Sequence, residues 1–182
     1  MAPTVHRVVV TGGPGAGKTT LVAALASLGH LTVSDSAREM IAERLSRGQS
    51  PRPEPLAFAR ELLARDTAKF NAVLGHPGLV FFDRSVLESV ALLHECEPLA
   101  PAELARLVGE YSFNTTVFLL PPWRAIYRTD AERDHDFAHS QRVASALGGW
   151  YGQLGYTIDE VPPASVGERV AHVLSTLATR GA

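Results

Sequence analysis

Residues 12–19 have the types and spacing of a phosphate-binding loop: a glycine, four residues, then Gly-Lys-Thr. Glycines let backbone N–H groups turn inward around phosphates, and a helix that follows adds partial positive charge. In this pattern Lys18 reaches the β- and γ-phosphates, and the Thr19 hydroxyl completes the shell of a bound Mg²⁺. The residues that we expect to contact the nucleotide are Gly13, Pro14, Gly15, Ala16, Gly17, Lys18, Thr19 and Thr20.

A second carboxylate, Asp83, ends a run of four apolar residues at 79–82. This is the form of a Walker B strand, whose acid holds Mg²⁺ directly or through water. We therefore expect Thr19 and Asp83 to be the protein's metal ligands. Asp83 could instead be the base that acts on an acceptor hydroxyl, and the sequence does not separate these roles. Arg84 follows at once and is a candidate substrate contact.

A third group of candidates, Asp35, Arg38 and Glu39, follows the second predicted strand. Ligands of open parallel sheets lie at the carboxyl ends of the strands, so we expect these side chains near the mouth of the loop. There they would bind a substrate, and Asp35 is a further candidate catalytic residue. Asp35 could also simply cap the helix predicted from residue 36. The two roles are compatible.

Residues 123–150 are polar and arginine-rich. One interpretation is a mobile lid whose Arg128 and Arg133 neutralise charge on a transferring phosphoryl group. The alternative is a solvated helix held by ion pairs between residues four apart, because acidic residues are interleaved with the arginines.

The elements that must position these residues follow from the apolar pattern. Strands are predicted at residues 5–11, 31–33, 79–82, 116–120 and 156–161. Helices are predicted at 18–28, 36–47, 55–73, 86–95, 101–111 and 165–178, with 123–150 mostly helical. This alternation predicts an α/β fold with a parallel sheet covered on both faces.

Length and composition indicate one domain and give no reason to expect binding to nucleic acid or insertion into a membrane. The 182 residues, 46% of them apolar, suit a single domain over residues 1–182. Within it, acceptor-side helices are expected at about 36–74 and a lid at about 123–150. The net charge of −2 gives no basic field for nucleic acid, and no apolar run reaches the roughly 18 residues of a membrane span.

The cysteine content and the N-terminal sequence favour a cytoplasmic location. The single Cys96 excludes an intramolecular disulfide and any site built from several thiolates. The predicted first strand and the glycine loop leave no place for a cleaved signal peptide. The oligomeric state stays open.

These motifs resemble those of small P-loop kinase-like ATPases, often labelled as single AAA domain proteins and related to nicotinamide-riboside kinase domains. The resemblance covers nearly the whole chain. Its segments are 8–20, 35–39, 82–85, 128–133 and 156–169. It implies a three-layer α/β/α P-loop NTPase fold with a five-stranded sheet in the order 2-3-1-4-5 and a small helical lid, as in nucleoside and nucleotide kinases. It further implies ATP as phosphoryl donor, Pro163 beside the adenine, and the 35–39 segment facing an acceptor.

The chain departs from the nicotinamide-riboside kinases at Asp35 and Ser36, where they usually carry a glutamate and an aromatic residue. An aromatic there could stack on a pyridine ring, so its absence argues against that acceptor. The leading hypothesis is an ATP- and Mg-dependent phosphotransferase acting on a small-molecule acceptor, either nucleoside-like or another hydroxyl compound. The alternative is a regulatory P-loop NTPase that hydrolyses ATP to switch a partner.

Overall fold

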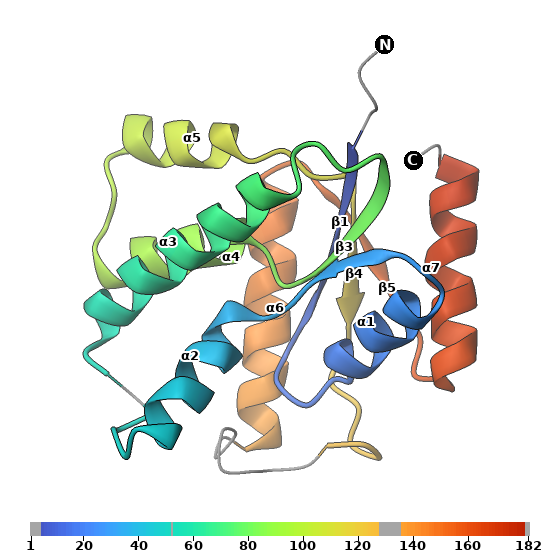
Figure 1. Ribbon diagram of the computed structural model, residues 1–182, viewed down its shortest axis with the longest axis horizontal. Coiled ribbons are helices and arrows are strands. Elements are labelled where there is room, and N and C mark those ends of the chain that lie inside the picture. Colours follow the sequence, from blue (N-terminus) through green and yellow to red (C-terminus); the bar gives the residue numbers. More distant parts are fainter. Residues whose placement is uncertain (1–4, 52, 128–135, 181–182) are drawn as a thin grey trace.

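The computed structural model describes residues 5–51, 53–127 and 136–180, which form an α/β fold (Figure 1). The strands in this part of the chain are β1 (Val5–Gly12), β2 (Leu31–Val33), β3 (Gly78–Asp83), β4 (Thr116–Leu120) and β5 (Thr157–Glu160). The helices are α1 (Lys18–Ser27), α2 (Ser36–Ser46), α3 (Pro55–Ala72), α4 (Val86–Cys96), α5 (Pro101–Glu110), α6 (Phe137–Gln153) and α7 (Val166–Arg180). The elements predicted outside residues 123–150 are confirmed to within three residues at each end.

The strands form one parallel sheet in the order β2-β3-β1-β4-β5, which confirms the predicted topology. Its register decides which side chains meet at the carboxyl edge. Val10 of β1 lies opposite Asp83 of β3, and Gly12 lies opposite Leu120 of β4. Asp83 therefore lies beside β1 two residues before that strand ends, close to the start of the loop.

Alternating side chains of the strands pack on two helical layers. Val8 and Val10 point into one core with Phe81 and Phe118, which α1 and α7 cover. Val9 points the opposite way, into a second core that α3, α4 and α6 cover. Figure 1 shows α1 and α7 on one side of the sheet and α3, α4 and α6 on the other. The three-layer arrangement is confirmed.

Most helices begin at a side chain that accepts backbone N–H groups, which are left without partners at a helix N-terminus. Asp35 accepts from the N–H of Arg38 at the start of α2, and Ser85 accepts from that of Leu87 at the start of α4. Ser165 and Glu168 form a reciprocal pair at the start of α7. These caps fix where the site-bearing loops end.

The C-terminal part of the predicted lid segment, residues 137–150, is helical as predicted and lies on the sheet. Residues 137–150 belong to α6, which packs on β1, β4 and β5. Tyr151 is fully buried in the core, and the indole N–H of Trp150 donates to the carbonyl of Leu87. The polar residues of this segment suggested a solvated element, but an apolar stripe along α6 anchors it to the sheet.

Candidate active site

The loop between β1 and α1 adopts backbone conformations that only glycine tolerates well. Gly12, Gly15 and Gly17 have φ angles of 139°, 76° and 85°. Close neighbours impose a second constraint, since a Cβ on Gly12 would lie 2.3 Å from the carbonyl oxygen of Leu120. The loop therefore folds tightly against the end of β4 and leads directly into the N-terminus of α1.

Lys18 is held inside this loop. Its ammonium donates to the carbonyls of Gly12 at 3.0 Å and Gly13 at 2.9 Å, and the side chain is buried. Burial, with the nearby charge of Arg84, lowers the pKa of Lys18 to about 8, although Asp83 and Asp35 partly oppose the shift. A lysine desolvated in this way gains when an anion arrives, because phosphate oxygens restore the interactions that water no longer supplies.

Thr19 and Asp83 meet as the sequence predicts. The Thr19 hydroxyl donates to Oδ2 of Asp83 over 2.9 Å, and Asp83 is only 4% exposed. Burial raises the pKa of Asp83, against the opposing charge of Lys18. Its second oxygen, Oδ1, is buried and has no hydrogen-bond partner among the described residues.

This donor set fits a magnesium ion. Mg²⁺ takes oxygen ligands and is usually held by one or two protein groups together with substrate phosphates and water. A hydroxyl and a carboxylate with one unsatisfied oxygen, next to a phosphate loop, supply such groups. Among the described residues, no cluster of three or more His, Cys, Asp or Glu side chains could hold a metal ion.

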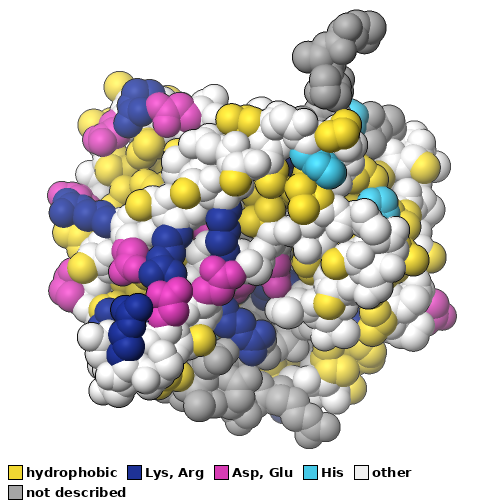
Figure 2. Space-filling view, in the orientation of Figure 1, with side chains coloured by type: hydrophobic (Ala, Val, Ile, Leu, Met, Phe, Trp, Pro, Cys, Tyr) yellow, Lys and Arg dark blue, Asp and Glu magenta, His cyan; other side chains and the backbone are white. Residues whose placement is uncertain are grey.

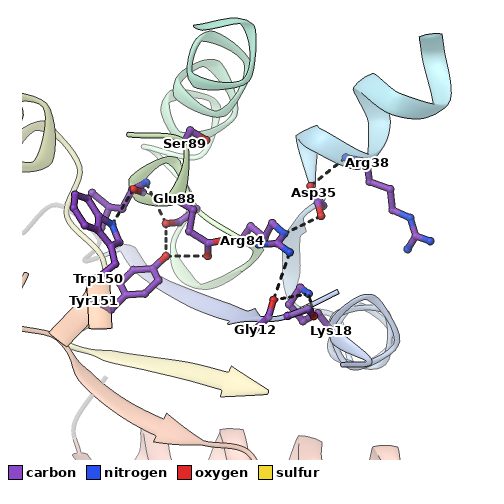
Figure 3. A network of polar contacts seen from close by, with 12 residues as sticks. Gly12, Lys18, Asp35, Arg38, Arg84, Glu88, Ser89, Trp150 and Tyr151 are labelled. Carbon is purple, nitrogen blue, oxygen red and sulfur yellow. Dashed lines mark hydrogen bonds and ion pairs between the residues drawn. The ribbon is translucent and has the colours of Figure 1, made fainter. Parts of the chain in front are cut away.

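Asp35, Arg84 and Glu88 form a charged cluster beside the loop (Figure 3). Nε of Arg84 donates to Asp35 at 3.1 Å, and Nη1 donates to Glu88 at 2.7 Å. Nη2 of Arg84 lies 3.4 Å from the carbonyl oxygen of Gly12, which Lys18 also contacts. Asp35 thus caps α2, as foreseen, and also pairs with Arg84 beside the loop. Its role toward a substrate stays a prediction.

The backbone of Arg84, directly after β3, adopts an unusual conformation at the edge of the sheet. Arg84 has a φ of 73°, and its N–H still bonds to the carbonyl of Val10. This left-handed conformation is costly for a residue with a side chain and indicates a position that its surroundings hold in place. Burial acts to lower the pKa of Arg84, but the charges of Glu88 and Asp35 outweigh it and raise the pKa overall.

Glu88 and Tyr151 complete the cluster and were not foreseen from the sequence. Tyr151 of α6 donates to Oε1 of Glu88 at 3.1 Å and shares a 2.6 Å hydrogen bond with Ser85. Both oxygens of Glu88 are therefore used, one by Arg84 and one by Tyr151. The spacing of Arg84 and Glu88, four apart at the start of a helix, was a signal of an ion pair. The tyrosine, 63 residues further on, had no such signal.

One cavity of about 880 Å³ joins these features. Its walls include Gly15, Lys18 and Thr19 from the loop, and Asp35 and Arg84 from the charged cluster. Asp83 is not among its lining residues. The walls away from the loop are largely apolar and come from α2, α3, α4 and α6, through Ala37, Ile41, Phe58, Leu62, Ala91, Leu92, Val143, Ala146 and Leu147.

The remaining predicted site residues differ in where they lie relative to this cavity. Arg38 lines the cavity, but Glu39 does not and instead pairs with Lys69 at 2.7 Å. Pro163 lines a separate space of about 10 Å³ with Trp123 and Arg169. Arg128 and Arg133 lie outside the described residues.

The surface over α2 and α3 carries mixed charge. Figure 2 shows acidic and basic side chains interleaved on the left of the view. Arg65 forms ion pairs with Glu43 and Glu61 at 2.8 Å, and Lys69 pairs with Glu39. This face is not the single-sign basic surface that binds nucleic acid. The helices of the described chain also include none that is both long and apolar enough to cross a bilayer.

A comparison with protein families gives one match over most of the chain. The model of a family described as "AAA domain" matches residues 7–169, which contain every predicted site residue. No curated protein matches the sequence.

Solved structures share the fold at low sequence identity. NadR in complex with NR superposes with a TM-score of 0.72 and 16% identity, covering 96% of this chain and 51% of NadR. Thymidylate kinase from Ehrlichia chaffeensis superposes with a TM-score of 0.64 and 14% identity, covering 96% of this chain and 100% of that kinase. Deoxyadenosine kinase from M. mycoides with bound dATP superposes with a TM-score of 0.60 and 13% identity, covering 94% of this chain and 99% of that kinase. This likeness establishes a fold shared with nucleoside and nucleotide kinases.

Proposed function

The chain belongs to the AAA domain family, and from this membership together with the geometry of the site we propose that it is a P-loop phosphotransferase. The donor in this proposal is ATP with Mg²⁺. The acceptor is a small molecule with a hydroxyl group, nucleoside-like in size and shape.

The observation that carries the proposal is the single cavity shared by the phosphate loop and the Asp35–Arg84 pair. An NTPase that only switches a partner needs a nucleotide site and an attacking water. It does not need a second, largely apolar compartment that opens onto the same loop. A volume of about 880 Å³ falls within the range of ligand pockets that enclose drug-sized molecules.

The acceptor compartment suits a flat, partly apolar molecule. Its walls offer aliphatic side chains and Phe58, together with charged groups that include Asp35 and Arg84 beside the loop and Asp66 and Glu95 on α3 and α4. A ligand here would place its polar, hydroxyl-bearing part toward the loop and its apolar part between α2, α3 and α6. The similar solved structures are consistent with this, since their names describe kinases of a nucleoside and a nucleotide.

In this proposal the two carboxylates have different tasks. Asp35 would orient an acceptor hydroxyl and accept its proton, which is supported by its position in the cavity wall and its bond to Arg84. Asp83 would hold Mg²⁺ together with the Thr19 hydroxyl, which is supported by its burial and its contact with Thr19. Held by Thr19 and Asp83, Mg²⁺ would supply positive charge against the negative charge that builds up during transfer.

Lys18 and the loop complete the donor side. The buried ammonium of Lys18 would exchange the carbonyls of Gly12 and Gly13 for phosphate oxygens. Arg84 bonds to Asp35, Glu88 and the carbonyl of Gly12. It would therefore keep Asp35 at a fixed position relative to the loop. The roles of Arg128 and Arg133 on the transferring phosphoryl group, the adenine contact of Pro163 and the cytoplasmic location stay predictions.

A two-step experiment tests the proposal. A thermal-shift screen with Mg²⁺ and a non-hydrolysable ATP analogue would first test nucleosides, sugars, vitamins and antibiotics, because ligands of the native state raise the melting temperature. Compounds that shift it would then be incubated with γ-labelled ATP. We expect label to move to at least one hydroxyl compound. Hydrolysis of ATP with no labelled acceptor would instead support the regulatory NTPase.

A further inference from the structure

Arg169 is a buried cation that neither the loop motif nor the charged cluster accounts for. It lies in the first turn of α7 and is 4% exposed. Its Nε is buried and has no hydrogen-bond partner, and Arg169 forms no ion pair with any residue that the structure describes. A guanidinium withdrawn from water without an anion is costly, so this side chain needs an explanation.

The position of Arg169 points to the phosphate loop. A Cβ built on Gly17 would lie 2.8 Å from Nη1 of Arg169 and 3.6 Å from Nη2, so the guanidinium packs directly against the last glycine before Lys18. This contact gives Gly17 a second reason to be glycine, besides its φ of 85°. The side chain therefore reaches from α7 to the N-terminus of α1, where anions bind.

Arg169 is also part of two cavity walls. It lines the large cavity next to Gly17, Thr20 and Ile126. It also lines the small space that holds Trp123, Pro162 and Pro163. Arg169 is thus shared by both spaces, and the large one also includes the loop residues Gly17 and Thr20.

A purely structural role would account for less of this arrangement. The guanidinium carbon lies 5.9 Å from the ring centroid of Trp123, so a cation–π contact is present. Such a contact can offset part of the cost of burial but leaves the Nε N–H without an acceptor. Burial lowers the pKa of Arg169.

We propose that Arg169 binds the phosphate chain of the donor nucleotide, from the α7 side of the loop. The inference rests on the proposed function, because it requires a nucleotide in the loop. It adds a second buried cation to Lys18 on that chain. A guanidinium presents several N–H groups in a planar fork that matches phosphate oxygens, and it stays charged at any working pH.

The test measures binding rather than turnover, so it needs no acceptor. Isothermal titration calorimetry on the full chain would compare MgADP, tripolyphosphate and adenosine for the wild type, Arg169→Ala, Arg169→Gln and Arg169→Lys. Arg106→Ala on α5 is the control, because it removes the same charge from a site 59% exposed and outside both cavities. Melting temperatures recorded in parallel would separate loss of fold from loss of binding.

We expect Arg169→Ala and Arg169→Gln to weaken both MgADP and tripolyphosphate on the order of 10- to 100-fold. Arg169→Lys should recover part of that loss, and adenosine should bind all variants alike. Unchanged tripolyphosphate affinity in folded Arg169→Ala would overturn the inference. If the alanine variant does not fold, equal affinities of the glutamine and lysine variants would overturn it. A wild type that binds neither MgADP nor tripolyphosphate would contradict the proposed function, and the inference with it.

Discussion

The Thr19 hydroxyl and Oδ2 of Asp83 are 2.9 Å apart, although 64 residues separate them in the chain. The parallel register of β1 and β3 makes this possible, because it sets Asp83 opposite Val10, just before the loop. The same contact leaves Oδ1 of Asp83 buried and without a hydrogen-bond partner among the described residues. In the proposed function, this is the oxygen that would be available to Mg²⁺.

Asp83→Asn is expected to weaken the use of Mg²⁺ more than it weakens nucleotide binding. The amide keeps the size of the side chain and can still accept from Thr19, but it cannot balance the charge of the metal. The measurement is ATP affinity and turnover across a magnesium titration. Glu110→Gln on α5, an exposed residue paired with Arg106, removes the same charge as a control. An unchanged magnesium dependence would contradict the assignment of Asp83.

Asp35 offers a pair of variants that separates capping from chemistry. Asp35→Asn keeps a side chain that caps helices well, so stability should change little while transfer to the acceptor falls. Asp35→Ala loses the cap as well and should cost about 1 kcal/mol more in stability. The measurements are the melting temperature, ATP affinity and kcat with an identified acceptor. An equal loss of ATP affinity in both variants would place Asp35 on the nucleotide side.

Tyr151→Phe is expected to destabilise the protein by about 1–3 kcal/mol, because it leaves one oxygen of the buried Glu88 without its donor. Urea denaturation measures the loss, with the slope of the transition unchanged. Tyr111→Phe is the matched control, since among the described residues that hydroxyl bonds to the hydroxyl of Thr67 alone, at 2.8 Å. Equal stability of the two variants would show that Glu88 does not depend on Tyr151.

The affinity for MgADP should fall as the pH rises through about 8. Burial lowers the pKa of Lys18 to that value, so the nucleotide-free protein loses the ammonium charge there. The stability of the free protein should change in the opposite direction. Between the folded pKa of about 8 and the ordinary value of 10.5, the unfolded chain binds more protons, and stability therefore rises with pH. Calorimetry at pH 7 and pH 9 measures the affinity, and a pH-independent affinity would exclude the lowered pKa.

The sequence was sufficient to place the residues that belong to a motif of fixed spacing or directly follow a predicted strand. The loop has a fixed spacing, and the strands that end at Gly12 and Asp83 are runs of apolar residues whose order could be inferred. Asp35 could be placed at the same edge because parallel strands end together. The structure confirms that topology.

Residues that join the site from distant elements could not be found in this way. Tyr151 reaches Glu88 from α6, and Arg169 reaches Gly17 from α7. Each depends on how a helix is rotated against the sheet, which periodicity within one segment does not fix. The sequence predicted that residues 123–150 are mostly helical but did not locate the start of α6 at Phe137. Its polar composition did not reveal that Ala144 and Tyr151 are buried.

The most direct test of the account is transfer of the γ-phosphoryl group of ATP to an acceptor, measured for the wild type and for Lys18→Ala. Lys18 is the only side-chain cation within the loop, and its ammonium is held by the carbonyls of Gly12 and Gly13 where phosphate would bind. We predict that the wild type labels the acceptor and that Lys18→Ala loses on the order of 10²-fold or more in rate. The variant should remain folded, because removing a desolvated charge from the interior carries little penalty. Label transfer by Lys18→Ala at the wild-type rate would contradict the account.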